Sequence, residues 1–135
     1  MASKTALFVS IGLASAALAG PTFAHHSFAM FDRQKEVVLM GTVKTFQWTN
    51  PHSFIELDVV SADGKVAAYS IEMNSPNNLT RQGWKSTTLK PGDKVAVTMN
   101  PLRDSSIGGL FVSVQLADGK VLGGPPNASP APPAS

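Results

Sequence analysis

Apolar and polar residues alternate along most of the chain between residues 36 and 122, and this period of two predicts β-strands. In residues 52–60, for example, the side chains of Ile55, Leu57 and Val59 fall on one face, and two carboxylates fall on the other. By this pattern strands are expected at residues 36–48, 52–60, 65–73, 95–99 and 110–116, and Val121–Leu122 is expected to add a short final strand.

Glycines interrupt this pattern at two informative places. Gly41 lies in the middle of the long first strand, where an isolated glycine predicts a bulge or a sharp bend. Asp63–Gly64 is a hairpin signal between the second and third strands. In the last long strand, alternation is expected to place one row of apolar side chains on a single face: Leu110, Val112, Val114 and Leu116.

The alternation stops after residue 73, and a helix signal replaces it. Ser75 is a suitable N-cap and Pro76 a suitable first helical residue. A short helix is expected over residues 77–82, ended by Gly83 in the left-handed conformation. Three strands, a short helix and two strands is the order of the five-stranded OB-fold barrel, so the expected fold class is all-β and OB-like. A small open β-sandwich is the alternative.

The first 24 residues have the features of a secretory signal peptide. Lys4 precedes an uncharged apolar stretch at residues 6–19, and Thr22–Ala24 offers small residues at the cleavage positions. Cleavage after Ala19 also fits this pattern, because Ala17 and Ala19 are small residues at the same two positions. Cleavage after Ala24 predicts a periplasmic or secreted bacterial protein with no transmembrane segment after signal removal. The expected organisation is a signal peptide at 1–24, the barrel at 25–122 and a Gly/Pro/Ala-rich disordered tail at 123–135.

Charge and cysteine content narrow the possible functions. Of the 11 basic residues, Lys4 lies in the expected leader, and nine acidic residues balance the other ten to leave a net charge of +1. The charges are scattered singly along the chain, so the sequence predicts no nucleic-acid partner. The absence of cysteine excludes disulfides, thiolate metal sites and cysteine nucleophiles. No nucleophile-elbow serine or phosphate-binding glycine loop is found, so a non-enzymatic binding or accessory role is expected.

Four segments together resemble a known family. They are HHSFAMFD after the leader, GTVKTFQWTNPH, the IE…L…GW stretch and LKPGDKV. In their order and spacing they resemble a family of small exported bacterial proteins classed as a domain of unknown function, over residues 25–122. The resemblance implies a single exported domain without an assigned activity. It also implies that His25, His26 and the Asn50–His52 motif are hallmark positions.

The histidines supply the candidate metal chemistry. Cleavage after Ala24 would give His25 a free α-amine beside its own imidazole, and the two together can chelate one metal ion. His26 and His52 are the candidates to complete the ligand set, with copper as the favoured ion, because a planar nitrogen set suits Cu(II). The affinity for the metal should decrease as the pH is lowered through the usual pKa range of histidine, near 6.5, because protonated imidazoles do not bind metal ions. Alternatively, the first two histidines form a solvated chain end, and His52 only closes a turn.

A second hypothesis needs no metal. In OB-folds, aromatic side chains on the sheet face form stacking platforms. Trp48, Tyr69 and Trp84 could therefore recognise an envelope protein, a saccharide or another small ligand. Alternatively, the tryptophans plug the barrel ends. Glu72 is expected to form a salt bridge with Arg81 between the third strand and the helix, or else to orient a ligand.

Overall fold

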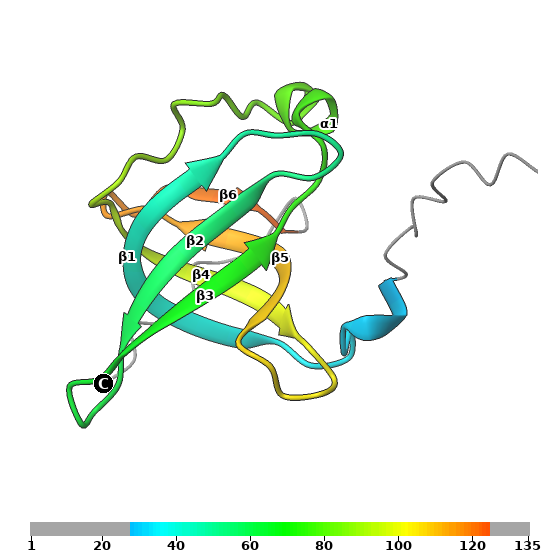
Figure 1. Ribbon diagram of the computed structural model, residues 1–135. Helices are drawn as coiled ribbons and strands as arrows, with labels where there is room; N and C mark the ends of the chain where they lie inside the picture. The colour runs from blue at the N-terminus through cyan, green and yellow to red at the C-terminus, as the bar shows by residue number, and fades with distance from the viewer. Residues whose placement is uncertain (1–27, 125–135) are drawn as a thin grey trace, which may run out of the picture.

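The computed structural model describes residues 28–124, and the elements follow the predicted order (Figure 1). The expected signal peptide and nearly all of the expected tail lie outside the described residues. The elements are the 3-10 helix η1 (Phe28–Met30), β1 (Val37–Gln47), β2 (Phe54–Val60), β3 (Val66–Glu72), α1 (Pro76–Arg81), β4 (Lys94–Pro101), β5 (Gly108–Gln115) and β6 (Val121–Gly123).

Strands β1 to β5 form a closed barrel. The sheet order is β3-β2-β1-β4-β5-β6, and β3 also pairs with β5 in parallel, from Ser70 opposite Gly108 to Glu72 opposite Leu110. All other pairs are antiparallel, and β6 extends the sheet beyond β5. A five-stranded barrel with one helix between β3 and β4 confirms the predicted OB-like fold. The alternative of an open sandwich is wrong.

Strand β1 curls so that its first half pairs with β4 and its second half pairs with β2. Thr42 is the crossover point, because it lies opposite both Lys94 and Asp58. The bulge predicted at Gly41 is found nearby, at Lys44, where the register with β2 shifts. Gly41 has a different role: a Cβ atom there would lie 2.6 Å from the backbone oxygen of Asp58. The glycine therefore allows two backbones to approach closely where the sheet folds over.

The prediction of one apolar face along β5 is wrong. The register with β4 shifts between Thr98 and Met99, which leaves Val112 as an extra residue on β5. A bulge of this kind reverses the alternation, because two residues of one strand then oppose one of the other. Val114 is consequently buried in the core, while Leu110 and Val112 are only half-buried and line a surface pocket.

The helix forms where its capping residues predict it. The hydroxyl of Ser75 accepts a hydrogen bond from the backbone N–H of Asn78 at 3.4 Å, and Pro76 is the first helical residue. Gly83 has a φ of +88°, the left-handed conformation that ends the helix. No helix between residues 28 and 124 has the length and apolar character needed to cross a membrane.

The core fills the barrel and is closed at one end by Trp84. This side chain is 1% exposed, and its ring centroid lies 5.5 Å from that of Phe111 and 6.0 Å from that of Phe46. The tryptophan lies just after α1, so the helix and the segment that follows it cover this end (Figure 1). The buried apolar residues clustered in the core are Leu39, Val43, Ile55, Leu57, Ile71, Met73, Leu79, Trp84, Leu89, Val95, Val97, Met99 and Val114.

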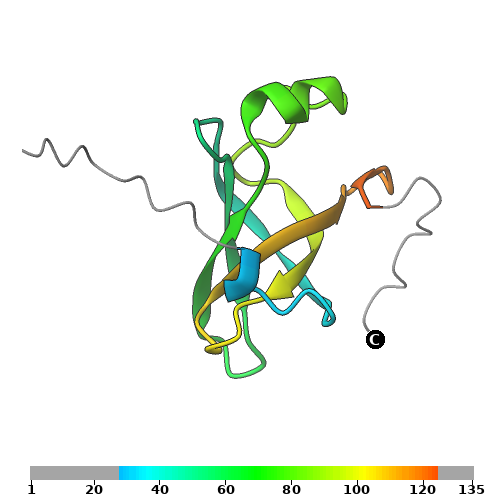
Figure 2. The same cartoon turned by 90° about the vertical axis from the view of Figure 1, so that its right-hand side faces the viewer.

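The segment before β1 is anchored beside the loop between β4 and β5 (Figure 2). Phe31 is 3% exposed and forms a backbone bridge with Leu102. Arg103 donates from its Nε to the backbone oxygen of Ala29 at 3.0 Å, and from its backbone N–H to that of Met30 at 3.0 Å. These contacts hold η1 against the barrel.

Candidate functional site

His52 is held at the start of β2 by the backbone on both sides of it. The backbone oxygen of His52 accepts a hydrogen bond from the hydroxyl of Thr49 at 2.9 Å. The next residue, Ser53, is fully buried and exchanges backbone hydrogen bonds with the end of β3: its N–H donates to Asn74 at 3.1 Å, and its oxygen accepts from Met73 at 2.8 Å. The position of the imidazole relative to β3 is therefore determined by the sheet.

One nitrogen of the His52 ring is already engaged by the protein. Its Nδ1 lies 3.1 Å from the backbone oxygen of Met73 and 3.4 Å from Oε1 of Glu72. Both neighbours are acceptors, so Nδ1 carries the hydrogen and donates it. In the neutral ring, Nε2 then has the free lone pair, which is the arrangement found in metal-binding histidines whose other nitrogen is oriented by a carboxylate or carbonyl. The side chain of His52 is 33% exposed, so the ring is accessible to a ligand.

The expected ion pair between Glu72 and Arg81 does not form. Glu72 lies opposite Phe54 in the register of β2 and β3, and its carboxylate contacts the histidine two residues before Phe54, on the same outward face. Arg81 lies on the last turn of α1 and is exposed, and its guanidinium donates to the side-chain oxygen of Asn78 at 3.4 Å. The carboxylate therefore orients a histidine, whereas the sequence pattern suggested a pair with a cation nine positions further along the chain.

A pocket of about 340 Å³ lies beside His52, between α1 and β5. Six of its lining residues are apolar, and three polar side chains accompany them, which is the usual composition of a ligand site. Most of these residues could not be predicted as a group from the sequence, because they come from distant segments. Leu110 and Val112, for example, reach the surface only because of the bulge in β5. The lining residues are Phe28, His52, Met73, Asn74, Leu79, Gln82, Leu110, Phe111, Val112, Gly123 and Gly124.

The first described residue of the chain lines this same pocket. Phe28 is 54% exposed and belongs to the η1 segment that Arg103 anchors. His25 and His26 lie outside the described residues, so their side chains are not placed. Within residues 28–124, no group of three or more His, Asp or Glu side chains could hold a metal ion.

The three aromatic residues of the second hypothesis do not share one surface. Trp84 is buried in the core. Trp48 is half-buried and packs edge-to-face on Phe46, with 5.6 Å between ring centroids. Tyr69 lines a different pocket, of about 300 Å³, together with Lys35 and Arg103. A buried ring cannot stack on a ligand, so Trp84 contributes to packing at the barrel end.

A family model described as a family of unknown function (DUF6152) matches residues 13–112. No curated protein matches the sequence. Two crystal structures of Rim1, the mitochondrial single-stranded DNA-binding protein of S. cerevisiae, are similar in fold. The first has 12% identity and a TM-score of 0.46, and covers 62% of this chain and 94% of its own. The second, the selenomethionine-labelled form, has 11% identity and a TM-score of 0.47, and the match covers 62% of this chain and 93% of the Rim1 chain.

The exclusion of nucleic acid as a partner is corrected by this comparison. The two solved structures described above are of a single-stranded DNA-binding protein, so the expectation of no nucleic-acid partner is contradicted. The exclusion relied on net charge and on the scattering of charges along the chain. Neither property describes where charges lie on the folded surface, since distant segments meet there.

Proposed function

This chain belongs to that family of unknown function (DUF6152), and from its site we propose that it is an exported, non-enzymatic protein that binds copper through its mature N-terminus. The ligands are the α-amine and imidazole of His25, with His26 and His52 completing the set. The family offers no activity to transfer, so the proposal depends on the chemistry of the residues themselves.

The observation that carries the proposal is the meeting of two chain segments at one pocket. Phe28 and His52 both line it, although 24 positions separate them in the sequence. Two residue steps join Phe28 to His26 and three join it to His25, and each step spans at most about 3.6 Å, so a short segment tethers both histidines to this pocket. His25 and His26 lie outside the described residues, so their approach to His52 is part of the proposal.

The orientation of His52 supports the same chemistry. Its Nδ1 is engaged by Met73 and Glu72, so Nε2 is available to a metal. A primary amine and imidazoles form the nitrogen-rich set that Cu(II) favours in a planar arrangement.

The proposal predicts that copper binding requires His25 to be the first residue. A protein that begins at His25 should bind one Cu(II) ion per chain, with the nitrogen hyperfine pattern of an amine–imidazole set in electron paramagnetic resonance. A protein that begins at Gly20, the alternative cleavage product, should bind at least about 100-fold more weakly, because the amine is then part of a peptide bond. Equal affinities of the two forms would overturn the proposal.

The contribution of His52 is tested separately in the protein that begins at His25. His52→Ala should weaken Cu(II) binding by at least about tenfold, and Glu72→Gln by a smaller factor, because the amide still accepts from Nδ1. Circular dichroism would verify that both variants remain folded. Unchanged affinity in His52→Ala would mean that the terminal peptide binds copper without the barrel.

A further inference from the structure

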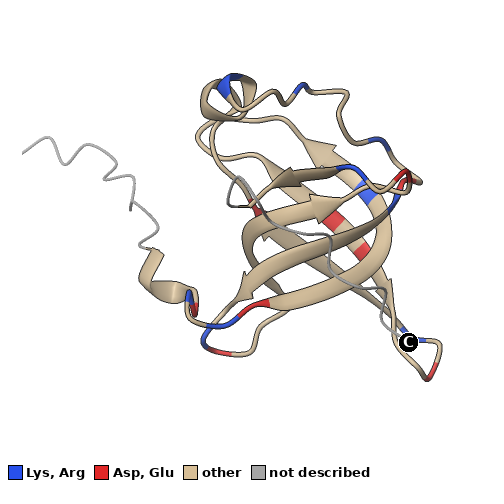
Figure 3. Ribbon diagram, turned by 180° about the vertical axis from the view of Figure 1, so that it is seen from behind, with Lys and Arg blue, Asp and Glu red and all other residues tan. Residues whose placement is uncertain are grey.

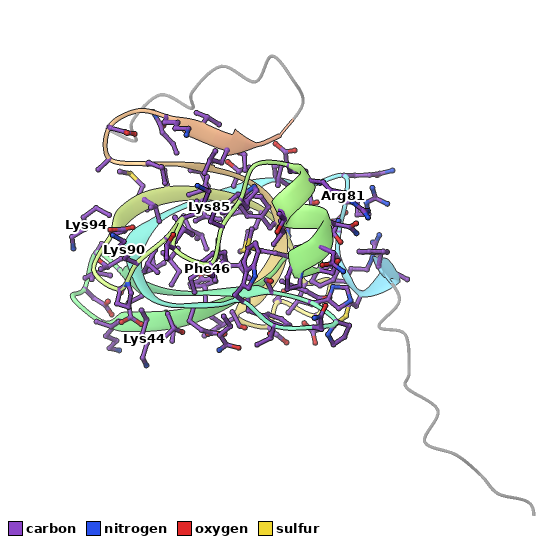
Figure 4. The ribbon with its side chains drawn as sticks, turned by 90° about the horizontal axis from the view of Figure 1, so that it is seen from above. Lys44, Phe46, Arg81, Lys85, Lys90 and Lys94 are labelled. Atoms are coloured by element: carbon purple, nitrogen blue, oxygen red, sulfur yellow. The ribbon has the colours of Figure 1, made fainter. Side chains whose placement is uncertain are left out.

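One end of the barrel is covered by α1 and the segment that connects it to β4, residues 76–92, here called the cap. Three buried apolar side chains fasten the cap to the core: Leu79 is 1% exposed, Trp84 1% and Leu89 2%. Its outer surface is seen from above in Figure 4. Because the cap is anchored by its own core residues, its outward side chains are available for another role.

The outward side of the cap is positively charged and has no acidic residue. Arg81, Lys85 and Lys90 are exposed, and the sequence from residue 73 to residue 92 contains neither Asp nor Glu. Figure 3 shows the same distribution, with basic positions along α1 and the segment that follows it. Among the residues described, the ion pairs are His52–Glu72 and Lys65–Asp63, so none of these three cations is in an ion pair. One carboxylate lies next to the cap: Asp93 follows it directly and accepts from the backbone N–H of Lys90 at 2.9 Å.

Two further lysines extend this charge to the rim of the barrel. Lys44 follows Val43, whose backbone oxygen accepts from Gly92 at the end of the cap at 2.8 Å. Lys94 begins β4, and its ammonium donates to the hydroxyl of Thr42 at 2.6 Å. In Figure 4, seen from above, the labelled side chains of Lys44, Lys90 and Lys94 lie toward one side of the molecule, that of Lys85 near its middle and that of Arg81 toward the other side. The positive charge therefore covers a broad face and does not follow a single line.

The cap offers charge and polar groups but no exposed large apolar side chain. None of the exposed large hydrophobic residues of the described chain lies within residues 76–92, and the aromatic ring within the cap is buried. The cap therefore suits a hydrated, polyanionic partner, and the nearest exposed apolar side chains lie beyond it, such as Met40, which lines a pocket with Lys94. The exposed large hydrophobic residues are Phe28, Met30, Val38, Met40, Val60, Val66 and Ile107.

We propose that the cap is a docking surface for an anionic phospholipid membrane, bound reversibly by electrostatic attraction. A lipid surface presents phosphates in two dimensions, which matches the spread of Arg81, Lys85 and Lys90 with the two rim lysines. Each cation close to such a surface raises the affinity about fivefold. The cap cations are not among the residues that line the His52 pocket, so the proposal does not depend on copper binding.

The test is sedimentation of residues 25–135 with phosphatidylcholine vesicles that contain or lack phosphatidylglycerol. Binding should require phosphatidylglycerol and should weaken at high salt. The triple variant Arg81→Gln, Lys85→Gln, Lys90→Gln should lower the partition coefficient by about 100-fold. These side chains are exposed, so circular dichroism should show an unchanged fold.

The matched control removes the same three charges elsewhere. Arg33→Gln, Lys35→Gln, Lys65→Gln changes exposed cations of the segment before β1 and of the β2–β3 hairpin, and it should retain most of the binding. If the two triple variants lost equal amounts of vesicle binding, the vesicles would be responding only to the net charge of the protein. That result would overturn the assignment of binding to the cap. A different outcome would assign the face to nucleic acid instead. In that case the unmodified protein would not bind these vesicles. It would bind a single-stranded oligonucleotide in a salt-sensitive way, and the cap variant would lose that binding.

Discussion

Trp84→Ala should lower the free energy of unfolding by about 3–5 kcal/mol, the usual cost of removing a fully buried aromatic side chain. The indole is 1% exposed and lies between Phe46 and Phe111, at the end of the barrel covered by the cap. Its removal would leave a cavity that the closed sheet cannot fill by collapse. Urea denaturation followed by circular dichroism measures the loss directly.

The control for this prediction is the other tryptophan. Trp48 is half-buried and contacts Phe46, but it lies outside the fully buried core. Trp48→Ala should therefore cost clearly less than Trp84→Ala, because less apolar area returns to water. If the two variants lost equal stability, Trp84 would not be the residue that closes this end of the barrel.

Gly41→Ala should lower the free energy of unfolding by about 1–3 kcal/mol, as expected for overpacking at a site that cannot expand. The new Cβ would lie 2.6 Å from the backbone oxygen of Asp58 and 2.8 Å from Cγ of Leu57. Relief would require β2 to move away from β1 at the point where β1 passes from one partner strand to the other. The measurement is the urea midpoint of the variant compared with that of the unmodified protein.

The neighbouring residue provides the control. Met40 is 53% exposed on the outward side of the same strand, so Met40→Ala should change stability by no more than about 0.5 kcal/mol. Equal midpoints for the two variants would mean that the close approach at Gly41 is relieved without cost.

Local signals were sufficient for the elements and their order. The capping residues Ser75 and Pro76 and the terminating Gly83 act within a few residues of one another, so the helix was predictable from its own segment. Alternation predicted the strands for the same reason. Strand β5 was predicted as well, but not the face on which each of its residues lies, because pairing with β4 forces Val112 out of register. A bulge depends on the partner strand as much as on its own sequence, and alternation along one strand contains no information about the partner.

The candidate site depends on contacts between distant segments. Sequence reasoning identified His52 and Glu72 but assigned Glu72 to Arg81, which is nine positions away. The carboxylate instead faces a histidine 20 positions away, because β2 and β3 are antiparallel neighbours. In the same way, the pocket beside His52 combines the start of the described chain, α1, β5 and the end of β6.

The sequence by itself determined the all-β barrel, the α-helix between its third and fourth strands and the family, because these follow from short-range periodicity, capping and motif spacing. Only the tertiary structure decided which residues meet. It brought Phe28 and His52 to one pocket, buried Trp84 while leaving Trp48 half-buried, and brought cations from three segments to the cap and its surroundings. The physical reason is that closing a barrel sets distances between residues far apart in the chain, and those distances depend on register, bulges and strand curvature.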